Sequence, residues 1–216
     1  MTYLYIVLLM LLSYLFGSFP SGVIVGQIFK QIDIRMHGSK NTGTTNSIRV
    51  LGWGLGSLVF ILDILKGAAV IWILKFLIQD PSLYAFGSLQ VSILSLYGLM
   101  AVVGHVFPVF LKFKGGKAVA TTSGIMLAIE PWSFVAAVLI FLIFVLVSRY
   151  VSVSSTVITI LVLSFYIIRA ALPHWWNSNW PSRIVDAIIM LSCAVIIILR
   201  HKTNYQRLQA GIENKV

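Results

Sequence analysis

The chain has 216 residues, of which 59% are hydrophobic and only 10% are charged. Soluble domains are nearer half apolar and about a quarter charged, so the composition excludes an ordinary soluble protein and indicates an integral membrane protein of one domain, residues 1–216. The formal charge of +10 favours anionic lipid head groups or phosphorylated substrates as partners over nucleic acid, and the single Cys193 excludes an intrachain disulfide or a cysteine-rich metal site.

Apolar segments predict an all-α fold with about seven transmembrane helices, because a spanning helix needs about 20 mostly apolar residues. The first segment has no basic start and resumes after a short polar break, which favours a retained span over a signal peptide. The fourth is short, and only Glu130-Pro131 separates it from the fifth, so the two are expected to form a tight helical pair. The predicted spans are residues 3–29, 53–78, 85–111, 117–130, 132–148, 151–168 and 184–199.

The distribution of Lys and Arg predicts the orientation of these spans. With the N-terminus outside, the inside segments hold twelve Lys and Arg, and the outside holds only Lys75, Arg169 and Arg183. Cytoplasmic loops carry an excess of such residues, so we expect the N-terminus outside, the C-terminus in the cytoplasm and an odd number of spans. The inside segments are then residues 30–52, 112–117, 148–150 and 200–216.

Tryptophans of the outside loop 169–183 are typical of an interfacial belt. They are Trp175, Trp176 and Trp180.

The first span is interrupted by GSFPSG, residues 17–22. Ser18 and Ser21 are candidates to face a polar interior and support a site. Close contact between helices through small residues accounts for the same pattern equally well.

A polar stretch, HGSKNTGTTNSIR, follows at residues 37–49. Glycine permits positive φ and asparagine tolerates it, so successive backbone N–H groups can converge on an anion. Arg49, where the next helix is expected to begin, can bind phosphate with two hydrogen bonds. The stretch is a candidate phosphate cradle without the P-loop pattern; a plain turn is the alternative.

Asp63 and Lys66 lie in the middle third of the second predicted span. Each ionisable side chain costs about 2.5–3.5 kcal/mol near the centre of a membrane helix. The i, i+3 spacing places them within pairing reach on one face. They are predicted either to support a functional site or to form a structural ion pair.

The stretch GHVFPVFLKFKGGKAVATTSG, residues 104–124, is the second candidate anion site. His105 lies near the cytoplasmic end of a span, and Pro108 is expected to kink or end that helix. Two glycines between Lys114 and Lys117 precede a new helix, whose N-terminus favours an anion. Snorkelling of lysines to the interface is the alternative, above all for Lys112.

His201 and Asn204 open the C-terminal tail, three residues apart. His201 is a candidate acid, base or phosphate donor. A histidine at a membrane boundary is more commonly none of these.

The patterns GSFPSG, HGSKNTGTTNSIR, DILKG, GHVFPVFLKFKGGKAVAT and RHKTNYQRLQAG occur in this order over residues 17–211. Together they resemble the bacterial membrane acyltransferases of the PlsY family. The resemblance implies an enzyme of phospholipid synthesis that transfers a fatty acyl group from acyl phosphate to the 1-hydroxyl of sn-glycerol 3-phosphate, giving lysophosphatidic acid. It implies no cofactor and no metal, and an active site at the cytoplasmic face of the bacterial cell membrane.

Three positions depart from the family pattern: Lys40 and Ala118 stand where relatives have glycine, and Thr44 stands where they have alanine. If position 118 requires a positive φ, alanine there costs about 1–2 kcal/mol. The departures bear on activity and substrate preference and leave the predicted fold unchanged.

Both substrates carry phosphate, so the predicted site holds two anions, and the sequence leaves open which loop holds which. Ser39, Arg49, Lys114 and His201 are the candidate catalytic residues. The acyl chain is expected between spans, in a groove open to the bilayer. The predicted phosphate-binding residues are Ser39, Asn41, Gly43, Thr44, Thr45, Asn46, Arg49, Lys114, Gly115, Gly116, Lys117 and Asn204, and the predicted supporting residues are Ser18, Ser21, Asp63, Lys66 and His105.

The general base is open on the sequence alone. No histidine has an aspartate five positions on, so the His-x-x-x-x-Asp pair of other glycerolipid acyltransferases is missing. Because the second pKa of a phosphate is about 6, a substrate phosphate can take the hydroxyl proton while His201 orients or neutralises it. His201 acting as the base is the alternative.

Other functions are compatible with parts of the pattern. A small transporter would explain the intramembrane Asp63 and Lys66 but predicts inverted repeats, which the sequence does not show. A non-catalytic relative that binds lipid or acyl phosphate would fit the three departures. A channel would need more polar residues along one face of a span.

Overall fold

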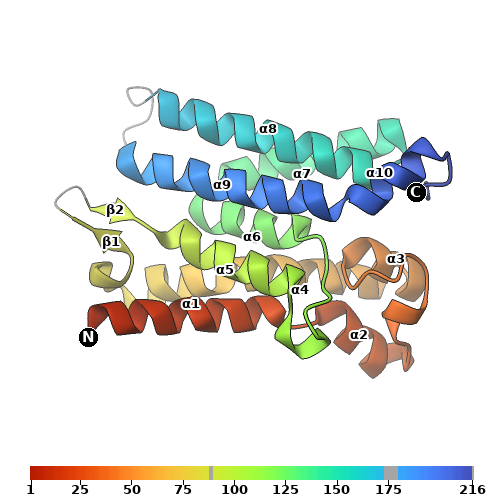
Figure 1. The fold of residues 1–216 in the computed structure, drawn as a ribbon, viewed down its shortest axis with the longest axis horizontal. Helices are drawn as coiled ribbons and strands as arrows, with labels where there is room; N and C mark the ends of the chain where they lie inside the picture. The colour runs from red at the N-terminus through yellow and green to blue at the C-terminus, as the bar shows by residue number, and fades with distance from the viewer. Residues whose placement is uncertain (88–89, 173–179, 216) are drawn as a thin grey trace.

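The computed structural model describes residues 1–87, 90–172 and 180–215 as an elongated helical bundle. α8 and α9 form one side, α1 and α4 the other, and α5 and α6 lie between them (Figure 1). The long helices are α1 (Thr2–Ser18), α4 (Trp53–Trp72), α5 (Leu94–Val106), α7 (Pro131–Ser148), α8 (Val151–Ala171) and α9 (Trp180–Arg200); the short ones are α2 (Ser21–Lys30), α3 (Thr44–Leu51), α6 (Val119–Ile129) and α10 (Lys202–Gln209).

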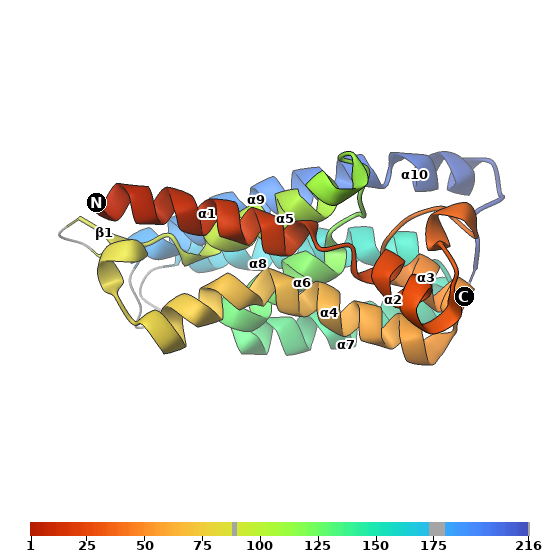
Figure 2. The same ribbon diagram turned by 90° about the horizontal axis from the view of Figure 1, so that it is seen from below.

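The chain termini lie at opposite ends of the bundle (Figure 2). The short helices α2, α3 and α10 gather at the end that carries the C-terminus. α3 and α10 come from the predicted inside segments 30–52 and 200–216, so two of these segments lie at this one end, the polar end of the bundle. Smaller elements complete the fold: the 3₁₀ turns Ile34–Met36, Pro81–Leu83 and Val109–Leu111, the π-helical end Ile73–Ile78 of α4, and an antiparallel pair of β1 (Ala85–Phe86) and β2 (Val91–Ser92).

The helical, membrane-spanning fold class is confirmed. Among the described residues, five helices are long and apolar enough to cross a membrane, and the bent pair α1 and α2, at 41°, makes a sixth. The fourth predicted segment forms α6, whose 11 residues extend only about 16 Å, short of the bilayer's hydrocarbon core of about 30 Å. The expected tight pair is present, since α6 ends at Ile129 and α7 begins at Pro131.

The predicted span 85–111 was wrong at its start. Its first residues form the short strand pair, and α5 begins only at Leu94. Hydropathy did not separate them, because an apolar strand and an apolar helix start look alike over a few residues.

Small residues set the distances between helices, as the alternative for the GSFPSG break anticipated. A Cβ on Gly17 of α1 would lie 2.0 Å from the carbonyl oxygen of Ala101 in α5. A Cβ on Gly67 of α4 would lie 2.0 Å from the carbonyl oxygen of Thr121 in α6. Small residues therefore let α1 pack closely on α5 and α4 pack closely on α6.

Candidate active site

The break between α1 and α2 carries polar groups to the ionisable pair of α4. Pro20 precedes α2, and the Ser21 hydroxyl donates to Asp63 Oδ1 at 2.9 Å. Lys66 Nζ lies 2.7 Å from the same oxygen and donates to the Phe19 carbonyl oxygen at 3.1 Å. The predicted pairing of Asp63 and Lys66 is therefore present, and the break in the first span supplies its other partners.

His105 and Thr42 complete this polar cavity. His105 Nδ1 is 3.7 Å from Asp63 Oδ1, and Thr42, which the sequence did not single out, lines the cavity from the polar loop before α3. Ser18 lines it too, and its hydroxyl is buried with no hydrogen-bond partner among the described residues. All five residues predicted to support the site thus surround one cavity: Ser18, Ser21, Asp63, Lys66 and His105.

Asn46 organises the predicted phosphate cradle from within. Its side chain is 1% exposed; its Nδ2 donates to the carbonyl oxygens of Ile34, His37 and Asn41, and its Oδ1 accepts from the backbone N–H of Ser39. Its hydrogen-bonding groups are used inside the loop, so Asn46 shapes the cradle.

The helix after the cradle begins earlier than expected. α3 starts at Thr44, so Arg49 lies exposed in its last turn and not at its start. Asn41 Oδ1 accepts from the Gly43 N–H at 2.9 Å, which fixes the entry into α3. No side chain of the described chain caps this helix, and the Thr44 hydroxyl is buried without a partner there.

The Gly115-Gly116 pair has a packing role that the sequence did not reveal. The N–H groups of Gly115 and Gly116 donate to the carbonyl oxygens of Val106 and His105 at the end of α5. A Cβ on Gly115 would lie 2.0 Å from the His105 carbonyl oxygen, and one on Gly116 would lie 2.0 Å from His105 Nε2. These two amides are therefore engaged with α5, in contrast to the anion-binding role expected of them.

Arg200, at the end of α9, holds the same loop from the other side. Its Nη2 donates to the Gly115 carbonyl oxygen at 2.9 Å and its Nε to that of Gly116 at 3.2 Å. The sequence offered no signal for this contact beyond a basic residue at a span end. The loop is thus fixed between α5 and α9, with Lys114 exposed and Lys117 half-buried.

Lys117 joins the glycine loop to the C-terminal tail. Its ammonium group donates to Asn204 Oδ1, and Asn204 Nδ2 donates to Glu213 at 2.6 Å. Arg207 Nε also donates to Glu213, at 2.6 Å. Glu213 was not predicted, although its position as the one acidic residue of a basic tail was a signal for it.

The charges of this cluster set its protonation states. Burial lowers the pKa of Lys117 to about 8; Glu213 opposes this shift, and the positive charges of Arg207, Arg49 and Arg200 add to it. Burial and Lys117 lower the pKa of His201 to about 4. His201 is therefore neutral at physiological pH, and Lys117 is mostly charged.

The tautomer of His201 follows from its contact with α9. Its Nδ1 lies 2.8 Å from the Ile197 carbonyl oxygen, which can only accept a hydrogen bond. The neutral ring therefore carries its proton on Nδ1 and leaves Nε2 as an acceptor.

Two of the departures from the family pattern occupy left-handed backbone. Lys40 has φ +59° and Ala118 has φ +64°, so the condition stated for position 118 is met. A left-handed conformation costs a residue with a Cβ about 1–2 kcal/mol.

Lys40→Gly is expected to raise the free energy of unfolding by about 0.5–1 kcal/mol, because relief of this strain exceeds the added entropy of the unfolded chain. Lys40 is exposed, whereas Ala118 is 2% exposed, and losing its buried methyl costs a further 0.8 kcal/mol or so. Ala118→Gly is therefore expected to change stability little. Equilibrium denaturation in mixed micelles compares the two variants; an equal gain from both would contradict this account.

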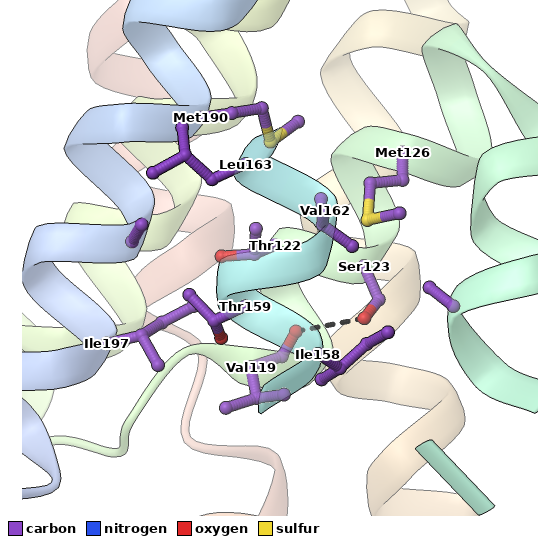
Figure 3. A pocket seen from close by; sticks show the side chains of 12 residues that line it. Val119, Thr122, Ser123, Met126, Ile158, Thr159, Val162, Leu163, Met190 and Ile197 are labelled. Carbon is purple, nitrogen blue, oxygen red and sulfur yellow. Dashed lines mark hydrogen bonds between the residues drawn. The ribbon is translucent and has the colours of Figure 1, made fainter. Parts of the chain in front are cut away.

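A mainly apolar groove, here called the apolar groove, runs between α6, α8 and α9 (Figure 3), and Thr122, Ser123 and Thr159 add hydroxyl groups to its lining. One end is lined by Val119, Ile158 and Ile197, and the other by Met126, Leu163 and Met190. Ala194 also lines it. Val119 is the second residue after Lys117, and Ile197 contacts His201. The first end of the groove therefore adjoins the cationic cluster, which consists of Lys117, Arg49, Arg200 and Arg207.

Within the described ranges, no group of three His, Cys, Asp or Glu side chains is placed to hold a metal ion. The predicted interfacial tryptophans Trp175 and Trp176 lie outside the described residues, as does the side chain of Trp180.

Comparison with known proteins gives a consistent result. A family model described as glycerol-3-phosphate acyltransferase matches residues 7–211. A protein named glycerol-3-phosphate acyltransferase from Enterococcus faecalis is 40% identical over 98% of this chain and 92% of its own length. One of the same name from Listeria monocytogenes is 41% identical over 98% of this chain and 96% of its own.

Two crystal structures are similar over nearly the whole chain. PlsY, described as an integral membrane glycerol 3-phosphate acyltransferase, superposes in its glycerol 3-phosphate form with a TM-score of 0.80, at 33% identity over 98% of this chain and 96% of that one. Its lysophosphatidic acid form gives a TM-score of 0.78, with 98% and 95% covered.

Proposed function

The chain belongs to the glycerol-3-phosphate acyltransferase family and is an integral membrane acyltransferase of phospholipid synthesis; we propose that its acyl donor is acyl phosphate and that its reaction centre is the cationic cluster around Lys117. The main support for this proposal is the hydrogen bond from Lys117 to Asn204, because it brings the glycine loop and the C-terminal tail together. Family membership favours this reading over a transporter or a channel.

Several cations near Lys117 suit a site for two phosphates. Arg49, Arg200 and Arg207 all lower the pKa of Lys117, so their charges act on one region. Because Gly115 and Gly116 use their N–H groups on α5, the cationic side chains and the uncapped start of α3 are the groups left to hold phosphate. Ser39 and the first residues of α3 would complete one phosphate site, and Lys117 and Asn204 the other, with His201 beside them.

The proposed reaction is a direct acyl transfer. The 1-hydroxyl oxygen of glycerol 3-phosphate forms a bond to the carbonyl carbon of acyl phosphate, the bond from that carbon to the phosphate oxygen breaks, and inorganic phosphate leaves with the electron pair. Cations fixed around the phosphates stabilise the developing charge, and holding both substrates together supplies proximity.

A substrate phosphate is the stronger candidate for the base. The pKa of His201 is about 4, whereas the second pKa of a phosphate is about 6, so the phosphate dianion holds a proton better by roughly two pKa units. Nε2 of His201 is an acceptor that can orient the attacking hydroxyl.

The acyl chain would occupy the groove between α6, α8 and α9, whose first end adjoins Lys117 and His201. α10 and the end of α9, which carry part of the cluster, lie at the polar end of the bundle (Figure 1), and the predicted inside segments hold twelve of the 16 Lys and Arg. The excess of positive charge supports a cytoplasmic site in a bacterial cell membrane, with the N-terminus outside.

Release of inorganic phosphate from acyl phosphate tests the proposal. The purified protein is given palmitoyl phosphate with and without glycerol 3-phosphate, and palmitoyl-CoA as a matched donor control. We expect release that depends on glycerol 3-phosphate and yields lysophosphatidic acid. Turnover with palmitoyl-CoA alone would overturn the donor, and no turnover in a folded sample would favour the non-catalytic relative.

The charge of Lys117 is expected to limit activity at alkaline pH. With a pKa of about 8, Lys117 loses its proton as pH rises through that value, so kcat/KM should fall above pH 8. Lys117→Arg keeps its charge, so its residual activity should persist to higher pH. A pH profile of both proteins measures this; an unchanged alkaline limb in Lys117→Arg would assign the limb to another group.

A further inference from the structure

Beyond the far end of the apolar groove lies a layer of polar residues, the floor layer: Tyr166 and Asp186, which are buried, and Glu130 and Arg169, which are partly buried. Arg169 Nη2 is 2.9 Å from Glu130 Oε2, and its Nη1 is 3.5 Å from Asp186 Oδ2. Tyr166 is 1% exposed, and its ring lies under the Arg169 guanidinium at 5.9 Å. The proposed chemistry does not use these groups.

Each wall of the groove reaches this layer within one helical turn. Met126 on α6 precedes Glu130 by four residues, Leu163 on α8 precedes Tyr166 by three, and on α9 Met190 follows Asp186 by four. Residues three or four apart share a helix face, so Tyr166 and Asp186 lie on the groove sides of α8 and α9, and Glu130 directly follows the last residue of α6. An acyl chain that continued along the groove would have to separate the ion pairs of this layer.

The distance from the reaction centre to this level matches one acyl chain. Along α9, Met190 lies eleven residues before His201, which is about 16 Å. One leaflet of a bilayer, half of the hydrocarbon core, is about 15 Å thick.

We propose that Met190 and Leu163, backed by the floor layer, form the closed end of the acyl site and set the longest acyl chain that the enzyme accepts. This inference rests on the proposed function. The bilayer is as apolar as the groove, so burial alone does not select a chain; the steric limit does. A first chain length that exceeds the space is expected to lose about tenfold or more in kcat/KM.

A series of saturated acyl phosphates of increasing length, assayed with glycerol 3-phosphate, tests the proposal. Met190→Ala deepens the groove, and we expect about a tenfold rise in kcat/KM for the chains just above the wild-type limit, relative to shorter ones. Ala194→Phe narrows the groove midway and should move the limit to shorter chains. Leu191→Ala and Val195→Phe change neighbouring residues of α9 that are each 48% exposed, and should leave the profile unchanged.

The outcomes separate this inference from the proposed function. Wild-type turnover with a length profile that Met190→Ala does not alter would mean that the chain leaves the groove sideways, and would overturn the inference alone. The same conclusion would follow if Val195→Phe acted like Ala194→Phe. No turnover of any acyl phosphate by the wild type would overturn both. Met190→Ala decides the question even if Ala194→Phe does not fold.

Discussion

Asp63→Ala is expected to destabilise the protein by about 3–5 kcal/mol, because it leaves the buried Lys66 ammonium without its counter-ion. The two side chains are 3% and 6% exposed, and the pair is 2.7 Å apart. The Phe19 carbonyl oxygen and the Ser21 hydroxyl remain as neutral partners, which does not compensate a buried charge. Equilibrium denaturation in mixed micelles measures the loss.

Two variants test the cause of this loss. Asp33→Ala removes an ion pair to Arg35 of 2.6 Å whose side chains are 26% and 41% exposed, and should cost about 1 kcal/mol or less. Combining Asp63→Leu with Lys66→Met removes both charges and should recover most of the stability. If the double variant stays as unstable as Asp63→Ala, a missing counter-ion is not the reason.

The ionisable pair was predictable because its partners lie one turn apart on one helix. Residues three apart share a face, and charges in an apolar span must be compensated. The Ser21 hydroxyl and His105 were separate candidates in the sequence, and only the packing of α2 and α5 on α4 brings them to Asp63. Such contacts between distant segments have no signature in local spacing.

The hydrogen-bond partners of the glycines and of Asn46 could not be predicted from the sequence. A Gly/Asn-rich composition predicts unusual backbone but not the partner of each N–H group. Gly115 and Gly116 donate to the end of α5, and Asn46 fastens its own loop. The same composition thus serves packing at some positions and leaves others, such as the start of α3, without a side-chain cap.

Helix boundaries were predicted least well. Hydropathy placed a span start at residue 85, where a short strand pair precedes α5, whereas the short segment 117–130 matches α6, Val119–Ile129, to within two residues. The Glu130-Pro131 break was readable because proline is favoured in the first turn of a helix. The closed end of the groove was not readable, because its charges come from three helices.

Lys117→Met is expected to lower kcat/KM by about 10²–10³-fold, because it removes a cation held beside both the glycine loop and the tail. Methionine keeps most of the length of the stem but cannot donate the hydrogen bond that Lys117 makes to Asn204. Since Lys117 is half-buried and opposed by several arginines, its removal should not unfold the protein. Initial rates of phosphate release with both substrates varied measure the effect.

Lys112→Met is the matched control, because Lys112 is exposed in the same connection between α5 and α6. It should leave kcat/KM close to the wild-type value, as expected of a lysine that only lies at the membrane interface. Equal losses in the two variants would mean that the loop contributes general positive charge, whereas a loss confined to Lys117→Met places the reacting phosphate beside that one ammonium group. The contrast matters because the sequence already assigned Lys112 to the interface and Lys117 to the anion site, and in the structure Lys112 is exposed whereas Lys117 contacts the tail.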